Sequence, residues 1–194
     1  GVITGYDAEG LPLINELYLC FDPQERLYIH GYWQEGIIPA FGLPDSELQQ
    51  IKRFLAEMDG FRKAKGADGK EAFSIPVDSS SNDEQFLQLD RISMHDWLLQ
   101  NNYNAPGLHW YINYCCRDDF GTDYRQASAW AGIHYFAGRK GLAANAAPQS
   151  VITWPEGNGW LVQQMQKKIA PYILPGTVAL NVDTTGEGVT VKVL

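Results

Sequence analysis

The chain has 194 residues, a length compatible with one domain, and 45% of them are hydrophobic, so a sizeable core can form. Its formal net charge of −8 argues against a nucleic-acid or acidic-membrane partner. No run of about 18 apolar residues occurs, so we expect no membrane span.

The three cysteines are a poor basis for disulfides, because Cys20, Cys115 and Cys116 are an odd number with one adjacent pair. No Cys/His spacing favours zinc. We expect free, buried thiols, which favour a reducing compartment. No signal peptide is visible. The chain opens with Gly1 rather than Met, so we expect it to derive from a longer chain, and cytoplasmic and periplasmic locations both stay open.

In the first half, alternating apolar residues predict a β-hairpin over residues 13–33, with its turn at 22–25. Residues 45–65 are the clearest helix, with Ser46 as its N-cap. Apolar residues at helical spacing predict one buried stripe on it: Leu48, Ile51, Phe54, Leu55 and Met58. Residues 71–76 are expected to form a short strand.

The second half reads as helices followed by a hairpin. Ser93 and Asp96 resemble a capping box at the start of a helix. Four helices are expected, at residues 93–101, 106–116, 127–139 and 160–169. Alternating residues then predict a terminal hairpin from 177–182 and 188–193. The order of hairpin, helices and hairpin predicts an α+β fold.

Charged residues follow the second of these helices in the run CCRDDFG, residues 115–121. Arg117, Asp118 and Asp119 are candidates for recognising a charged substrate. Two carboxylates can share acid–base work when their environments separate their pKa values, but neighbours on a helix do not face each other. A structural charge cluster at the helix end is the alternative.

The run SAWAGIHYFAGRKG, residues 128–141, places Trp130, His134 and Tyr135 within about one turn of each other. His134 could act as a general base or orienting donor, or could be a satisfied core histidine. Ser128 lacks a nucleophile context, because no GxSxG motif occurs.

The run WPEGNGW, residues 154–160, predicts a tight turn into a helix. Helix N-termini offer free N–H groups to anions, but Glu156 lies in this loop and no GK[ST] follows, so a phosphate loop is weakly supported. Trp154 and Asn158 are further candidates for binding a substrate, in a turn that is expected to form a docking surface or pocket wall.

Taken together, residues 114–121, 128–139 and 153–159 resemble a bacterial branch of the FAD-dependent amine oxidoreductases, over most of the chain. The resemblance implies a Rossmann-like flavin domain into which a substrate domain is inserted. Residues 1–176 would be the substrate-binding region with its return helix. Residues 177–194 would be flavin-domain strands, with the Val182 backbone near the adenine end of FAD.

The chain departs from such enzymes in one respect, because no GxGxxG occurs to hold the FAD pyrophosphate. We therefore expect a region that binds a small-molecule substrate, is completed by missing flavin-domain segments of the same protein, and binds no FAD alone. The full protein would oxidise an amine or a related C–N or C–H bond. The alternatives are a non-catalytic ligand- or protein-binding module with an aromatic-rich surface and, less well supported, a hydrolase using Asp118 and Asp119.

Overall fold

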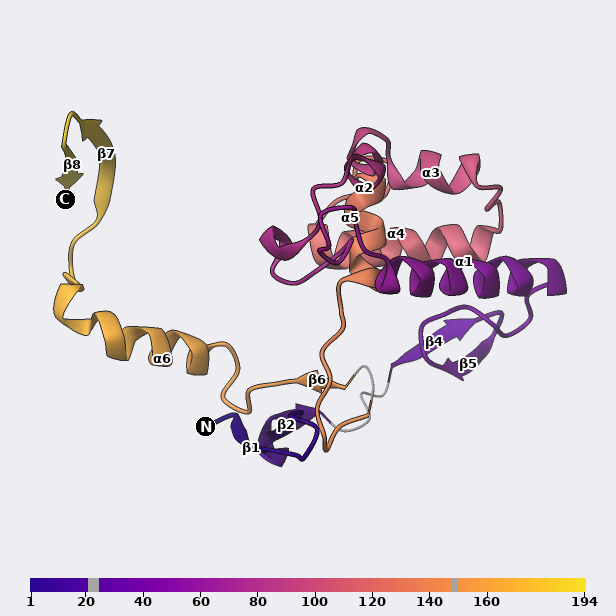
Figure 1. The fold of residues 1–194 in the computed structure, drawn as a ribbon, viewed down its shortest axis with the longest axis horizontal. Helices are drawn as coiled ribbons and strands as arrows, with labels where there is room; N and C mark the ends of the chain where they lie inside the picture. The colour runs from indigo at the N-terminus through magenta and orange to yellow at the C-terminus, as the bar shows by residue number, and fades with distance from the viewer. Residues whose placement is uncertain (21–24, 148–149) are drawn as a thin grey trace. The chain divides into compact units, whose positions relative to one another are not determined.

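The structure, a computed structural model, describes residues 1–20, 25–147 and 150–194 (Figure 1). It is α+β, with helices in the middle of the chain and small antiparallel hairpins towards both ends. The chain forms two compact units. We call residues 1–15 and 19–151 the helical unit, and residues 16–18 and 152–194 the C-terminal unit.

The helical unit contains two hairpins and five helices among its described residues. Its hairpins are β1 (Ile3–Tyr6) with β2 (Pro12–Ile14) and β4 (Arg26–Ile29) with β5 (Tyr32–Glu35). Its helices are α1 (Asp45–Lys63), α2 (Glu84–Leu87), α3 (Met94–Gln100), α4 (Pro106–Phe120) and α5 (Ala129–Ala137). Short 3₁₀ helices lie at Val77–Ser79 and Gln88–Arg91.

The C-terminal unit consists mainly of one helix and one hairpin. The helix is α6 (Gly159–Ile169), and a 3₁₀ turn at Ala170–Tyr172 follows it. The hairpin is β7 (Ala179–Thr185) with β8 (Gly188–Val193). A 3₁₀ turn at Glu16–Tyr18 belongs to the same unit. The two-residue strands β3 (Leu19–Cys20) and β6 (Val151–Ile152) pair where the chain passes between the units.

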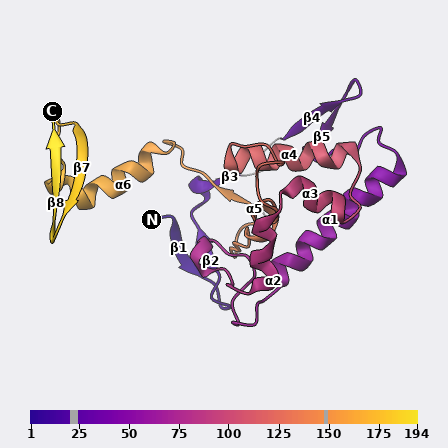
Figure 2. The same ribbon diagram turned by 90° about the horizontal axis from the view of Figure 1, so that it is seen from above.

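One hydrophobic core holds the helical unit together. In both views α1, α3, α4 and α5 gather into one bundle (Figure 1, Figure 2). Fully buried side chains of these helices and their connections fill it: Phe54, Phe73, Met94, Leu98, Tyr103, Leu108, Ile112 and Ile133. Such close packing fixes the positions of the helix ends and loops around it.

Local sequence signals account for the ends of the helices. The hydroxyl of Ser93 accepts a hydrogen bond from the Asp96 N–H at 3.0 Å and caps α3, as the capping-box pattern predicts. Ser128 caps α5 in the same way, through the Ala131 N–H at 3.2 Å. Gly121, with φ 63°, ends α4 in the left-handed conformation that suits glycine.

The predicted hairpin over residues 13–33 is wrong, and its predicted turn falls largely on residues 21–24, outside the described part of the chain. Ile29 pairs directly with Tyr32, so His30 and Gly31 form the two-residue turn of β4–β5. Both have positive φ, 50° and 84°, which is the requirement of a type I′ turn. His-Gly carries this turn in place of the more common Asn-Gly.

Three smaller predictions also differ. Pro44, not Ser46, holds the N-cap position of α1. The predicted strand at 71–76 is absent, because the Ser74 N–H bonds to the Ser80 hydroxyl at 2.9 Å rather than to a neighbouring strand. On α1, Ile51, Phe54 and Met58 are buried as expected, while Leu48 and Leu55 are half-buried.

The other predicted helices and the terminal hairpin are confirmed, and no end differs by more than four residues. The sequence placed a boundary between residues 176 and 177. That boundary between a substrate region and flavin-domain strands stays a prediction. The compact units divide between Val151 and Ile152, so α6 lies in the same unit as the last hairpin.

Candidate functional site

The charged residues at the end of α4 lie on its last, exposed turn. Arg139 Nη2 donates to both carboxylate oxygens of Asp119, at 2.7 and 2.9 Å. The Arg139 guanidinium also lies 4.1 Å from the centre of the Tyr135 ring and donates to the Tyr135 carbonyl at 2.6 Å. Arg139 thus connects Asp119 to Tyr135 and ties the end of α4 to the end of α5. Arg117 and Asp118 are exposed on the same turn.

Trp130 and His134 stack on α5, with ring centres 4.9 Å apart and an interplanar angle of 19°. The buried ring of Phe73 packs against both, at 5.3 and 6.4 Å. His134 Nε2 lies 2.7 Å from the Ser74 carbonyl oxygen. A carbonyl only accepts, so Nε2 carries the proton and donates it. His134 is therefore half-buried with one ring nitrogen already in use.

Trp130 keeps a buried indole N–H that has no hydrogen-bond partner among the described residues. Its ring is half-buried between Phe73 and His134, so packing alone accounts for its position. The three candidates of α5 therefore belong to two separate groups. Tyr135 contacts Arg139, whereas Trp130 and His134 pack against the loop that contains Phe73 and Ser74.

The cysteines of α4 are protected rather than reactive. Burial raises the pKa of the Cys115 thiol to about 12, and burial together with the nearby carboxylates of Asp123 and Asp119 raises that of Cys116 to about 12. Burial also raises the pKa of Tyr135 above its ordinary value. Since the thiolate is the nucleophilic form, neither thiol is suited to catalysis near neutral pH.

In the C-terminal unit, Trp154 and Trp160 stack with ring centres 4.6 Å apart and planes only 7° from parallel. Tyr18 packs against both rings, at 5.4 and 5.7 Å. Gly157 has φ 67°, which lets the chain turn sharply before α6. Asn158 holds the N-cap position, but its side chain makes no capping bond. These contacts support a tight turn closed by aromatic packing.

Val182 lies on β7 directly opposite Val191 and is 60% exposed. Val182, Trp154 and Asn158 all belong to the C-terminal unit, whereas the candidates on α4 and α5 belong to the helical unit. Each unit therefore carries its own group of candidate residues.

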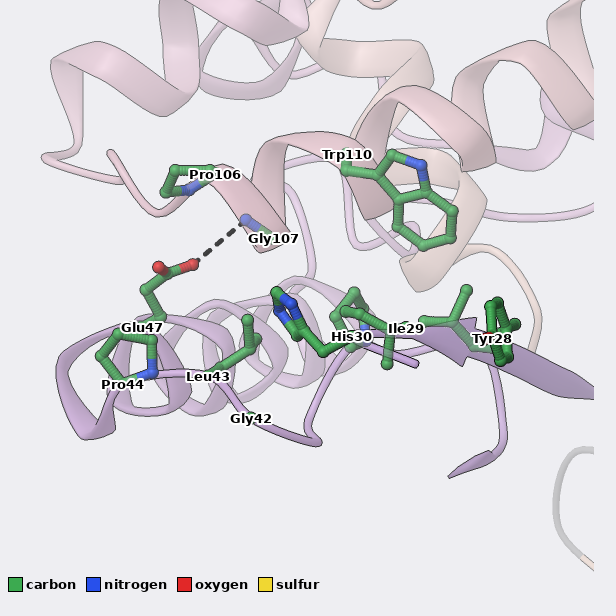
Figure 3. Close-up of a pocket in the computed structure, with 12 residues that line it drawn as sticks. Tyr28, Ile29, His30, Gly42, Leu43, Pro44, Glu47, Pro106, Gly107 and Trp110 are labelled. Carbon is green, nitrogen blue, oxygen red and sulfur yellow. Dashed lines mark hydrogen bonds between the residues drawn. The ribbon is translucent and has the colours of Figure 1, made fainter. Parts of the chain in front are cut away.

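The helical unit also has a pocket that the sequence did not indicate. Its volume is about 460 Å³, within the range of small-molecule sites. Strand β4, the loop that precedes α1, and the first turns of α1 and α4 surround it (Figure 3). The residues lining it are mostly apolar: Leu27, Tyr28, Ile29, His30, Pro39, Gly42, Leu43, Pro44, Glu47, Pro106, Gly107 and Trp110.

Figure 3 shows how the polar groups of this pocket lie. Glu47 reaches from α1 to the start of α4, where its Oε2 accepts a hydrogen bond from the Gly107 N–H at 3.2 Å. The indole of Trp110 projects from α4 towards β4, and the His30 imidazole stands on the opposite wall. Among the described residues that line the pocket, Glu47 is the one carboxylate, and none is Lys or Arg.

Sequence reasoning missed the pocket because its walls come from three separate segments. His30 holds its place through the positive-φ turn of β4–β5, and it closely approaches Gly42, where an added Cβ would lie 3.2 Å from the His30 ring. The one sequence signal for the pocket was the cluster of aromatic residues Tyr28, Tyr32 and Trp33. Their side chains are exposed, which the spacing of the residues alone does not predict.

No protein-family model, curated protein or solved structure matches the chain. In the described residues, no group of three or more His, Cys, Asp or Glu side chains could hold a metal ion. No described helix is both long enough and apolar enough to cross a bilayer.

Proposed function

We propose that this chain is the substrate-binding region of an FAD-dependent oxidoreductase that acts on an amine or a related substrate, completed by further segments of the same protein. The observation that carries the proposal is the uncovered apolar surface of the C-terminal unit. The resemblance of residues 114–121, 128–139 and 153–159 to amine oxidoreductases supports flavin-domain segments of the same protein as the layer that would cover this surface.

The β7–β8 hairpin has one apolar and one polar face. Its register sets Val182 opposite Val191 and Thr184 opposite Val189. Because side chains alternate along a strand, Leu180 and Val193 share the face of these residues. On this face the side chains of Leu180 and of the four valines, Val182, Val189, Val191 and Val193, are 48–62% exposed. A two-stranded hairpin is marginally stable alone, so this face needs a covering layer.

Helix α6 is uncovered in the same way. Leu161, Val162, Met165 and Ile169 recur at helical spacing on one side and are 38–59% exposed, and no residue of the helix is buried. An amphipathic helix followed by an amphipathic hairpin fits the return of a chain from a substrate domain into a larger sheet.

The residues present do not make up a flavin site by themselves. No GxGxxG lies in the sequence, and the Val182 backbone would supply at most a peripheral contact. In the completed protein the flavin would accept the hydride. The roles that we assign to this chain are substrate contacts from Arg117 and Asp118 and from the surfaces around Trp130, His134, Tyr135, Trp154 and Asn158. Asp119, which Arg139 already holds, would fasten α4 to the end of α5.

The test is an FAD titration of two proteins, the 194-residue chain and a longer product that carries the coding sequence on both sides of it. We expect the short chain to bind no stoichiometric FAD and the longer product to bind one FAD, seen as flavin absorbance that survives gel filtration. Tight one-to-one binding by the short chain, or a longer product without flavin, would contradict the proposal.

A second function, a non-catalytic binding module, is favoured by the aromatic surface of the β4–β5 hairpin. Tyr28 and Trp33 pair across the strands at 5.2 Å and are 60% and 69% exposed, while Tyr32 packs against Phe41 at 4.8 Å. Exposed aromatic groups beside a pocket are typical of binding surfaces. A longer product without flavin would favour this function.

A further inference from the structure

The pocket between β4, α1 and α4 has two ends of different character, as Figure 3 shows. The Glu47 carboxylate lies at one end, beside Gly107 at the start of α4. The Trp110 indole lies at the other end, directed towards Tyr28 and Ile29 of β4 rather than towards Glu47. The two ends therefore offer different contacts to a ligand.

The Glu47 end is held together by close contacts within the protein. The Gly107 N–H donates to Glu47 Oε2 at 3.2 Å. A Cβ added at Gly107 would lie 3.1 Å from Leu43 Cδ1 and 3.6 Å from Pro39 Cβ, and Pro39 is fully buried. The Glu47 carboxylate thus fastens the start of α1 to the start of α4 and closes this end of the pocket.

The Trp110 end is apolar and open. Trp110 is 46% exposed, and Tyr114 on the next turn of α4 stacks against its indole with ring centres 6.0 Å apart. Leu27 and Ile29 of β4 line the same pocket and are half-buried. These side chains leave apolar surface that a ligand ring can cover, and contact between aromatic rings stabilises by more than the buried area alone.

The charges of the lining do not suit an ion. Glu47 and His30 are the described lining residues that can be charged near neutral pH. Glu47 would repel an anion. His30 is exposed at the β4–β5 turn, where its ring lies 3.2 Å from a Cβ added at Gly42, and it would repel a cation whenever it is protonated.

A cation at the Trp110 end would also have no carboxylate beside it among the described lining residues, because Glu47 lies at the other end. Removing an unpaired charge from water costs far more than removing a neutral polar group. The apolar end of the pocket therefore favours an uncharged ligand.

We propose that this pocket binds an uncharged aromatic molecule, with its ring between Trp110 and the apolar residues of β4. A volume of about 460 Å³ has room for a two-ring compound. Glu47 shapes the pocket through its bond to Gly107 and does not pair with the ligand. Binding requires no flavin and no redox step, so the inference survives or fails separately from the proposed oxidoreductase function.

The test compares three probes of the same shape by isothermal titration calorimetry on the 194-residue chain: 2-naphthalenemethanol, 2-naphthoate and 2-naphthylmethylammonium. At neutral pH we expect saturable one-to-one binding of the alcohol, about tenfold tighter than that of either ion, because only the alcohol enters without losing the hydration of a charge. An ion that binds as tightly as the alcohol, or no saturable binding of the alcohol at millimolar concentration, would overturn the proposal.

Nuclear magnetic resonance with the same alcohol locates its site in the folded chain. We expect the largest shifts of amide signals at residues 27–30 and 107–110, which include both walls of the apolar end. The exposed apolar side chains of α6, β7 and β8 are the competing place for a naphthalene ring. Largest shifts in the C-terminal unit would therefore contradict the assignment to this pocket.

Variants test the two ends separately. Trp110→Ala should weaken binding of the alcohol several-fold and fold normally, since the side chain is 46% exposed. Glu47→Gln keeps an oxygen for the Gly107 N–H while removing the charge, so the affinity for the alcohol should stay unchanged. Phe120→Ala is the matched control, because Phe120 is an exposed aromatic residue of α4 outside the pocket lining.

These variants are compared only where the circular dichroism spectrum is that of the wild type. Wild-type affinity in Trp110→Ala, or an equal loss in Phe120→Ala, would show that the ring does not bind against Trp110. A several-fold loss in Glu47→Gln would show that the carboxylate pairs with the ligand. Each of these results would overturn the proposal.

Discussion

The helical unit and the C-terminal unit contain similar apolar residues but use them differently. In the helical unit, aromatic and aliphatic side chains such as Phe54 and Leu108 are fully buried. In the C-terminal unit, α6 has no buried residue and the valines of β7 and β8 are about half-exposed or more. Apolar patterning therefore predicts an element, whereas its burial depends on a partner surface.

This difference also separates the kinds of function that each unit supports. The helical unit has a core that can hold a pocket and an ion pair in fixed geometry. The C-terminal unit offers amphipathic surfaces that require cover. Stability changes should therefore be large in the first unit and small in the second.

Phe54→Ala tests this most strongly. The ring packs edge-on against Tyr103 and Phe136, at 5.7 and 5.3 Å, with no exposure to solvent. Its removal should cost about 3–5 kcal/mol of unfolding free energy, through lost burial and a cavity. Chemical denaturation followed by circular dichroism measures the loss.

Val182→Ala is the comparison in the C-terminal unit, and its expected cost is below about 0.5 kcal/mol, because the side chain is 60% exposed. A cost as large as that of Phe54→Ala would mean that the apolar face of β7 and β8 is buried in solution, and would remove the main support for a missing covering layer.

Alkaline pH should destabilise the helical unit through its thiols. Burial raises the pKa of Cys115 and Cys116 to about 12, whereas a cysteine thiol in the unfolded chain has a pKa of about 8.5. Between these values the unfolded state loses the proton first and binds fewer protons, so stability falls as pH rises. The expected slope is about 1.4 kcal/mol per pH unit for each thiol.

Denaturation midpoints measured from pH 8 to 11 reveal how steeply stability falls with pH. Cys116→Ala removes one of the two thiols, so it should remove the contribution of that thiol to the slope. The stability contributed by the raised pKa values is complete below about pH 8.5 and declines above it. Rapid labelling of Cys115 and Cys116 by a thiol reagent in the native chain at pH 8 would show that they are not buried as described.

Gly132→Ala tests the close approach of α5 to α3. An added Cβ would lie 2.6 Å from both Cγ and Sδ of Met94, whose side chain is fully buried. Because Met is flexible, part of the clash can relax, and a cost of about 1–3 kcal/mol is expected. Denaturation midpoints measure it.

Gly60→Ala is the matched control, with the opposite sign. Gly60 lies within α1, and no atom lies within 4 Å of an added Cβ, so alanine should stabilise the chain by about 0.5–1 kcal/mol. A neutral Gly132→Ala would mean that α3 and α5 do not approach as closely as the structure shows.

Sequence patterns predicted the elements better than their partners. The capping residue Ser93 was sufficient to predict α3, and the helical spacing of apolar residues was sufficient to predict α1, because both are local properties of the sequence. The β4–β5 turn was missed because the positive φ of His30 is an uncommon choice for a type I′ turn. The strand expected at 71–76 failed because the hydroxyl of Ser80, six residues beyond Ser74, takes the Ser74 N–H.

The candidate residues show the same limit. Asp119 and Arg139, 20 residues apart, come together only because α4 and α5 pack side by side, which the sequence does not reveal. The pocket of Glu47 and Trp110 depends on Gly107 lying beside α1, a contact between residues 60 positions apart.

The smallest expected effect concerns Asp119→Asn. Its pair with Arg139 joins side chains that are 28% and 48% exposed, so its loss should cost only about 0.2–1 kcal/mol. Asp118→Asn, on the same turn and without an ion pair among the described residues, should leave the unfolding free energy unchanged. Chemical denaturation of both variants at low and high salt separates the pair from a general charge effect.

If the proposed oxidoreductase function is correct, the result also decides what Asp119 does in the completed protein. A residue that only fastens α4 to the end of α5 should change stability and leave kcat/KM alone. A residue that recognises a charged substrate should lower kcat/KM in Asp119→Asn even where the unfolding free energy is unchanged. Since Arg139 already neutralises this carboxylate, we expect the first result, with Arg117 and Asp118 left as the charges on that turn available to a ligand.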